Sequence, residues 1–179
     1  MRKYAIPVVF SLFISLFGCA TPERNCRTLD NSITPIGYSI ADNLVNNLSQ
    51  KINSNDQIIV SSFVNVNNLE QSSTFGRIIA EQVASRLSQN GYKIIELKLR
   101  QNSIFIQEGK GEFMLSRNLK DLSRTYNASA IVVGTYGDGY DRIYVTSRIV
   151  NPNDNTIIAS ADGQFPMHPN RMNVLLRSK

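Results

Sequence analysis

The sequence predicts one α/β sandwich domain, with a mixed sheet of about five strands and three helices in the order α-β-α-β-α-β-β-β. Three segments carry apolar residues at helical spacing, and they alternate with short apolar runs that are typical of strands. Two alternating segments joined by a turn follow, which predicts a hairpin. Helices that alternate with strands before a final hairpin indicate a mixed sheet covered by helices.

The first helix is expected to begin near Pro35, with Thr34 as its N-cap. Its apolar residues recur at every fourth position and form one stripe facing a core. The first strand is expected over Gln57 to Val66. The run Ile58–Val60 in this strand is continuously apolar, as in a strand covered on both faces. The residues of the helical stripe are Ile36, Ile40, Leu44 and Leu48.

The second helix is expected from Thr74 to Asn90. Ser73 or Thr74 can cap its first turn, and Gly91 suits the left-handed position past its end. The next strand is expected over Tyr92 to Leu99. On the helix, the apolar face consists of Phe75, Ile79, Val83 and Leu87.

The middle of the chain is less regular. Ile104–Ile106 is a candidate short strand, Gly109–Gly111 is a turn or loop, and Ser116 is the expected cap of a third helix. The remaining strands are predicted at Ala130–Val133, ending at Gly134, then at Arg142–Val150 and Thr156–Phe165. The connecting turns are predicted at Gly137–Gly139 and Asn151–Asn155, where turn-forming residues cluster.

The N-terminus has the pattern of a signal peptide over residues 1–18. Arg2 and Lys3 precede an apolar stretch from Ala5 to Phe17, which is too short for a permanent membrane span. This stretch ends in Leu16-Phe17-Gly18-Cys19, which resembles the lipobox of bacterial lipoproteins. We therefore expect cleavage between Gly18 and Cys19 and acylation of the Cys19 thiol.

Acylation would anchor the mature protein, because two or three acyl chains together bind a bilayer stably. By resemblance to lipoprotein sorting in Gram-negative bacteria, Ala20 after the cysteine favours the outer membrane, with the domain facing the periplasm. Residues 19–34 are expected to form a lipidated tether, 35–166 the domain, and 167–179 a C-terminal tail. Cys26 is either a free thiol in the tether or an intermolecular disulfide partner.

The sequence contains no pattern that predicts catalysis, a metal site or a cofactor site. His168 is the single histidine, so a site built from several histidines is excluded, and no pattern of partner residues for a histidine-based triad or metal cluster surrounds it. Loss of Arg2 and Lys3 with the signal peptide lowers the formal charge from +5 to +3. A mild excess without a basic run argues against nucleic acid as a partner.

Four segments in order resemble the FlgO-type family of flagellum-associated outer-membrane lipoproteins. The resemblance implies a fold similar to the N-terminal domain of the Tol-system propeller protein and to the curli secretion lipoprotein. It also implies a non-enzymatic, protein-binding role in the flagellar outer-membrane apparatus and in motility, with a homo-oligomer left open. The four segments are Val66–Arg77, Gly111–Arg117, Val132–Tyr136 and Tyr144–Val150.

Two other functions stay open at this stage. The first is activation of a cell-wall synthase, since such activator lipoproteins share this kind of fold, and the second is a curli-type secretion role. The segment before the second helix is the candidate partner contact, although its serines could instead serve only to cap the helix. The candidate contact residues are Leu69, Glu70, Gln71, Ser72, Ser73 and Arg77.

Overall fold

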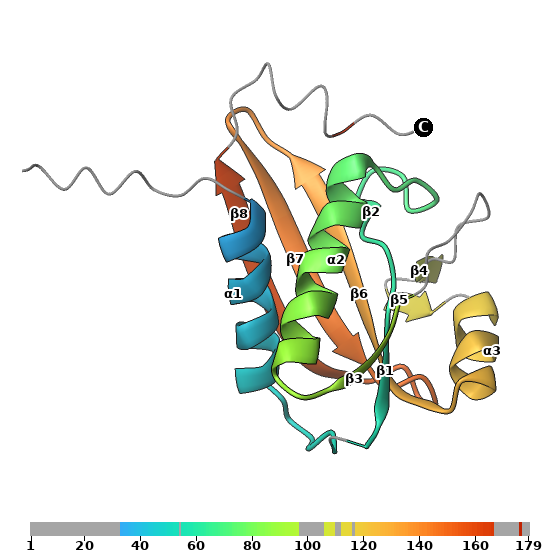
Figure 1. Cartoon of the computed structure of the whole chain (residues 1–179). Helices are drawn as coiled ribbons and strands as arrows, with labels where there is room; N and C mark the ends of the chain where they lie inside the picture. The colour runs from blue at the N-terminus through green and yellow to red at the C-terminus, as the bar shows by residue number, and fades with distance from the viewer. Residues whose placement is uncertain are drawn as a thin grey trace, which may run out of the picture.

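The computed structural model describes residues 33–53, 55–96, 106–109, 112–115, 117–166 and 176 (Figure 1). The described residues form three helices and a mixed sheet, which confirms the predicted fold class. In chain order the elements are α1 (Ile33–Asn46), β1 (Gln57–Val60), β2 (Val64–Asn65), α2 (Thr74–Gln89), β3 (Lys93–Glu96), β4 (Ile106–Gly109), β5 (Glu112–Leu115), α3 (Arg117–Thr125), β6 (Ala128–Asp138), β7 (Arg142–Val150) and β8 (Ile157–Pro166).

The main sheet has the strand order β3-β1-β6-β7-β8, and β2 also pairs with β6. The strand β1 is parallel to both β3 and β6, whereas β6, β7 and β8 form an antiparallel meander. The strands β4 and β5 form a separate antiparallel pair. The parallel half arises because a helix lies between β1 and β3, while short turns connect the antiparallel half.

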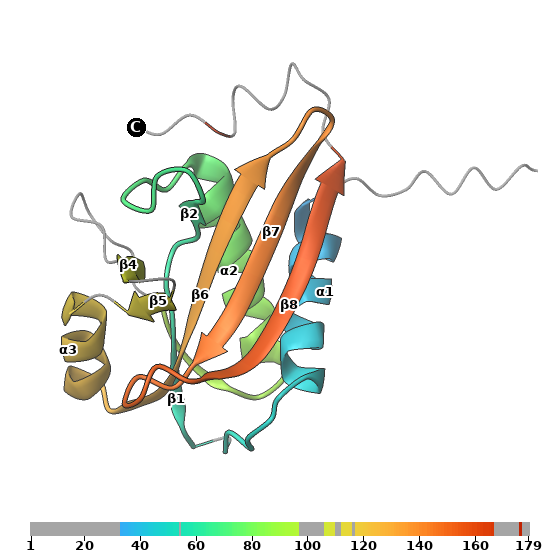
Figure 2. The same ribbon diagram turned by 180° about the vertical axis from the view of Figure 1, so that it is seen from behind.

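Two helices cover one face of the sheet and the third covers part of the other face (Figures 1 and 2). The larger core lies beneath α1 and α2, where Leu44, Val83 and Val132 are completely buried. The smaller core lies beneath α3, where Leu119 packs with Ile131. Alternation along β6 explains both cores, since neighbouring residues of a strand point to opposite faces.

The helices α1 and α2 run parallel to each other. Gly37 approaches Gln82, and further along α1 Asp42 binds Arg86. The helix α1 runs antiparallel to β8, because Gly163 near the end of β8 approaches Ile36 and Ile40. At the other end of α1, the Ser49 backbone N–H donates to the Ile158 carbonyl at 2.8 Å.

One end of the molecule therefore collects several chain segments, and we call it the apical end. It contains the starts of α1 and α2, the loop of residues 66–73 and the β6–β7 turn of residues 139–141. In Figure 1 these segments lie at the upper end of the drawing. Tyr136 near the end of β6 and Phe165 near the end of β8 both contact Phe75, which places these strand ends beside the start of α2.

Three predicted boundaries are wrong. The helix α1 begins at Ile33, so Thr34 lies inside its first turn instead of capping it; Pro35 fits there because the first four N–H groups of a helix have no intrahelical partner. The expected strand Gln57–Val66 divides into β1 and β2. The strand β6 continues past Gly134 to Asp138, because pairing with β7 extends to that residue. The turn predicted at Gly137–Gly139 therefore lies at residues 139–141 instead.

Other local predictions are confirmed. Ser73 caps α2, Gly91 has a φ of +90°, and Asn155 has a φ of 61° in the predicted β7–β8 turn. Leu176 packs against the larger core. Several predictions lie outside the described residues, namely those on residues 1–32, including Gly18, Cys19 and Cys26, on Ile104 and Phe105, on Lys110 and Gly111, on Ser116, and on His168 with most of the tail.

Candidate protein-contact surface

The loop of residues 66–73 is ordered by its own hydrogen bonds. The Asn65 backbone N–H donates to the Gln71 carbonyl at 2.9 Å, which closes the loop. Two asparagine side chains accept from backbone N–H groups two residues later, Asn65 from Asn67 at 2.8 Å and Asn68 from Glu70 at 3.1 Å. These Asx turns fix the backbone locally. The loop consequently presents its exposed side chains from a defined conformation.

The two serines at the end of this loop point inward. Ser73 is completely buried, and its hydroxyl accepts from the Gly76 backbone N–H at 3.2 Å. The Ser72 hydroxyl donates to the Phe63 carbonyl at 2.8 Å. The capping role weighed in the sequence analysis is therefore present at Ser73. Both serines hold the loop against the domain.

The other candidate contact residues lie nearer the surface. Leu69 is half-buried, whereas Glu70, Gln71 and Arg77 are exposed. Arg77 stands in the first turn of α2, where its guanidinium donates to the Thr74 hydroxyl at 3.3 Å. The structure thus brings a carboxylate, an amide and a guanidinium to one ordered loop and the adjoining helix start.

Two glycines of the family-like segments allow the loop to pack closely. A Cβ atom on Gly76 would lie 2.2 Å from the Phe63 carbonyl oxygen, and one on Gly134 would lie 2.4 Å from the Phe63 ring. Real Cβ atoms do not approach so closely, so both positions require glycine. The segments Val66–Arg77 and Val132–Tyr136, which carry the family resemblance, therefore meet around Phe63.

An aromatic cluster supports the start of α2. The Phe75 ring meets Tyr136 edge-on at a centroid distance of 5.4 Å and Phe165 at 5.1 Å. Burial raises the pKa of Tyr136, while its hydrogen bonds to Ser73 act in the opposite direction. The phenol is therefore protonated at neutral pH. In this state Tyr136 serves packing and hydrogen bonding, which stabilise the loop from below.

The β6–β7 turn and the start of β7 carry exposed aromatic side chains that the sequence analysis did not identify as functional. Tyr140 is 94% exposed and Tyr144 is 55% exposed. The turn is closed by the Gly139 backbone N–H, which donates to the Arg142 carbonyl at 2.8 Å. The sequence signal was the Gly-Asp-Gly-Tyr segment, but only the fold shows that these tyrosines lie at the apical end.

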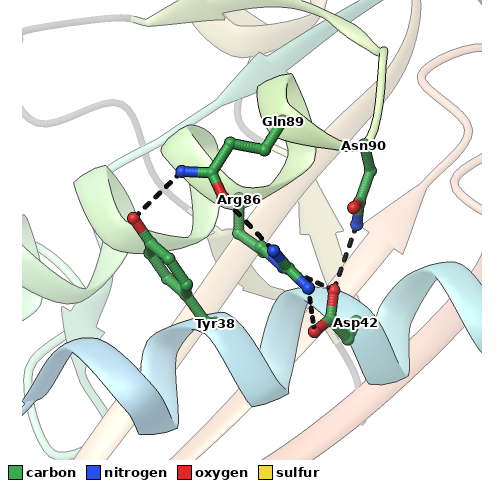
Figure 3. Close-up of polar contacts among 5 residues, drawn as sticks. All are labelled: Tyr38, Asp42, Arg86, Gln89 and Asn90. Carbon is green, nitrogen blue, oxygen red and sulfur yellow. Dashed lines mark hydrogen bonds and ion pairs between the residues drawn. The ribbon is translucent and has the colours of Figure 1, made fainter.

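A polar network joins α1 and α2 on their outer surface (Figure 3). Arg86 binds Asp42 through two hydrogen bonds of 2.8 and 2.9 Å, and Asn90 donates to the same carboxylate at 3.1 Å. The Arg86 guanidinium carbon also lies 5.6 Å from the centre of the Tyr38 ring, whose hydroxyl accepts from Gln89. Hydrogen bonding to Arg86 lowers the pKa of Asp42. This network fixes the two helices side by side.

Within the described residues, no group of three or more His, Cys, Asp or Glu side chains could hold a metal ion. Among the same residues, no helix is both long and apolar enough to cross a bilayer. The fold and its surface define a class of protein: an α/β sandwich domain that presents an ordered loop and exposed side chains at one end.

The sequence matches the family described as FlgO protein over residues 38–170, so the chain belongs to that family. No curated protein sequence matches the chain. Among solved structures, the fold is similar to the LpoB C-terminal domain from Salmonella enterica, with a TM-score of 0.53, 9% identity and coverage of 76% of this chain and 99% of that one. The fold is also similar to the LpoB C-terminal domain from Escherichia coli, with a TM-score of 0.51, 9% identity and coverage of 74% of this chain and 97% of that one.

Proposed function

We propose that this protein is a lipid-anchored, non-enzymatic interaction module of the flagellar outer-membrane apparatus and that it supports motility. The observation that carries the proposal is membership of the FlgO family over nearly the whole domain. The domain sits on the periplasmic side of the outer membrane, held there by an acylated Cys19. Its partners are proteins of the flagellar outer-membrane structure, with further copies of this chain as a possible addition.

The loop of residues 66–73 is the contact we assign to these partners. Its backbone is already fixed by internal hydrogen bonds, so little conformational entropy is lost on binding. Glu70, Gln71 and Arg77 offer charged and amide groups that can form directional contacts. Leu69 contributes apolar area beside them, whereas Ser72 and Ser73 act by keeping the loop in place.

The anchor makes weak contacts productive. A module held beside the membrane meets a membrane-bound partner at an effective concentration far above its concentration in free solution. The 13 residues between Cys19 and Ile33 would keep the domain close to the bilayer. A small and polar contact surface is then enough to keep the domain bound to its membrane-bound partner.

The main alternative is activation of a cell-wall synthase. The similarity to LpoB domains concerns the fold alone, and fold similarity does not distinguish the two functions. A deletion strain separates them. We expect it to assemble fewer filaments or to swim poorly while its sensitivity to cell-wall antibiotics stays at the wild-type level. Normal swimming combined with increased antibiotic sensitivity would contradict the flagellar proposal and favour the synthase activator.

A further inference from the structure

The β6–β7 turn places a large amphipathic side chain in solvent. Tyr140 at its tip is 94% exposed, which leaves almost its whole surface free for a contact. Tyr144 lies below it, and a Cβ atom on Gly139 would be 3.0 Å from the Tyr144 ring. The turn therefore rests on one tyrosine and projects the other beyond the domain.

The tether enters the domain at the same end. Gly163 of β8 lies against Ile36 in the first turns of α1, and Gly163 pairs with Val145 of β7. Three residues before Val145, β7 begins at Arg142, next to the turn. At about 3.3 Å per residue, β7 begins roughly 10 Å beyond the level of Ile36 and Ile40, and α1 starts at Ile33 toward the same end. Figures 1 and 2 both show the β6–β7 turn at the end where α1 begins.

The length of the tether limits how far this end can move from the membrane. Thirteen residues separate Cys19 from Ile33. Thirteen residues can span at most about 45 Å, so the start of α1 lies within that distance of an acylated Cys19. Since the domain is held through its apical end, that end meets the lipid surface more often than any other part.

We propose that the Tyr140 turn docks on the phospholipid headgroups of the anchoring membrane and orients the domain with its apical end toward the bilayer. This inference rests on the acylated Cys19 of the proposed function. Tyrosine suits the location because its ring favours the membrane interface while its hydroxyl stays hydrated. The loop of residues 66–73 then lies close to the membrane, where it can reach a membrane-bound partner.

The charges around the turn favour a zwitterionic surface over a strongly anionic one. Asp138 and Asp141 are exposed acids at the turn. Arg142 neutralises Asp141 through an ion pair of 3.0 Å. Arg77 and Asp138 both act on the Tyr136 hydroxyl, Arg77 lowering its pKa and Asp138 raising it. Among the described residues, the apical end therefore has no excess of basic side chains, so aromatic insertion has to supply the docking energy.

The test uses the full mature lipoprotein in vesicles of phosphatidylethanolamine with a minor share of phosphatidylglycerol, in a Cys26→Ser background. A fluorophore is attached through Asp141→Cys in the β6–β7 turn next to Tyr140, or through Asn153→Cys in the β7–β8 turn at the opposite end. We expect quenchers attached to lipid headgroups to quench the Asp141 label several-fold more than the Asn153 label. Tyr140→Ser should reduce that difference, with thermal unfolding unchanged because the side chain is exposed.

Equal quenching at the two positions, or a difference that survives Tyr140→Ser combined with Tyr144→Ser, would overturn the docking proposal while leaving the anchor intact. A mature chain that does not float with the vesicles would refute the anchor itself and the docking with it. Shielding of the Asp141 label in native outer-membrane preparations but not in protein-free vesicles would assign the turn to a protein contact and overturn the lipid proposal.

Discussion

At the scale of single residues, packing explains two of the four segments that carry the family resemblance, Val66–Arg77 and Val132–Tyr136. Phe63 occupies the space that Gly76 and Gly134 leave by lacking a side chain. Ser72 and Ser73 then attach the loop to Phe63 and to the first turn of α2. These residues hold the contact loop in place, and all of them are buried except the half-buried Ser72.

Gly76→Ala should destabilise the domain by about 1–3 kcal/mol, because the added methyl group would meet the Phe63 carbonyl and force the backbone to move. Ser73→Ala should cost about 1 kcal/mol through loss of the N-cap. Urea denaturation of each variant measures both values. Arg77→Ala, an exposed neighbour, serves as the control. Wild-type stability in the Gly76→Ala variant would show that the close approach is not required.

The pKa of Asp42 gives a pH-dependent prediction. Hydrogen bonding to Arg86 holds this pKa below its usual value in the folded state. The resulting stability is present above the unfolded pKa of about 3.9 and is lost as the pH falls through the lower folded pKa. The stabilisation from the Asp42–Arg86 ion pair is below about 1 kcal/mol, because both side chains are about one-third exposed.

Asp42→Asn should therefore have a lower melting temperature than wild type at pH 6. The difference between the two melting temperatures should shrink as the pH falls below 4. Thermal unfolding of both proteins between pH 6 and pH 3 measures the effect. The Asp141→Asn variant, which changes an exposed pair between chain neighbours, is the matched control. A gap between wild type and Asp42→Asn that stays constant over the whole range would refute the assignment.

At the scale of elements, the sequence predicts best where local signals decide the structure. The boundaries of α2 follow from Ser73 and Gly91, which act on their own neighbours. The end of β6 could not be predicted, because the cross-strand partner of Gly137 is Tyr144 and that pairing belongs to the tertiary structure. Likewise, β2 separates from β1 because it pairs with β6 at a different position.

The residues of the contact surface could likewise be predicted only in part, because their exposure depends on the tertiary structure. The sequence placed the loop before α2 among the candidates because its residues resemble a family signature. It did not distinguish Ser73, which is buried, from Arg77, which is exposed. Tyr140 was not singled out, since its position relative to the start of α1 depends on how β7, β8 and the helix pack together.

Substitutions on the loop should affect function more than stability. We expect Gln71→Ala combined with Arg77→Glu to reduce swimming in soft agar while changing the melting temperature little, because both side chains are exposed. The control is Arg124→Glu, which changes an exposed arginine in the last turn of α3, away from the loop. Equal swimming of the loop variant and the Arg124→Glu control would show that the loop is not part of the contact surface.

At the scale of the whole molecule, one face of the sheet holds most of the buried apolar residues. Leu44 of α1 and Val132 of β6 are both completely buried in the larger core. Leu44→Asp or Val132→Asp places an unpaired charge there and should cost about 4 kcal/mol or more. Circular dichroism melts test this, with the exposed Asn46→Asp as control. Melts identical to wild type for both core variants would contradict the core assignment.

The central claim is that this FlgO-family domain works as a module held at the outer membrane by Cys19. The most direct measurement is the swimming rate of a strain whose single copy carries Cys19→Ser, compared with wild-type and deletion strains at matched protein abundance. The account predicts swimming close to that of the deletion strain, because the folded domain no longer concentrates at the membrane. Swimming at the wild-type rate, with the protein recovered in the soluble fraction, would contradict it.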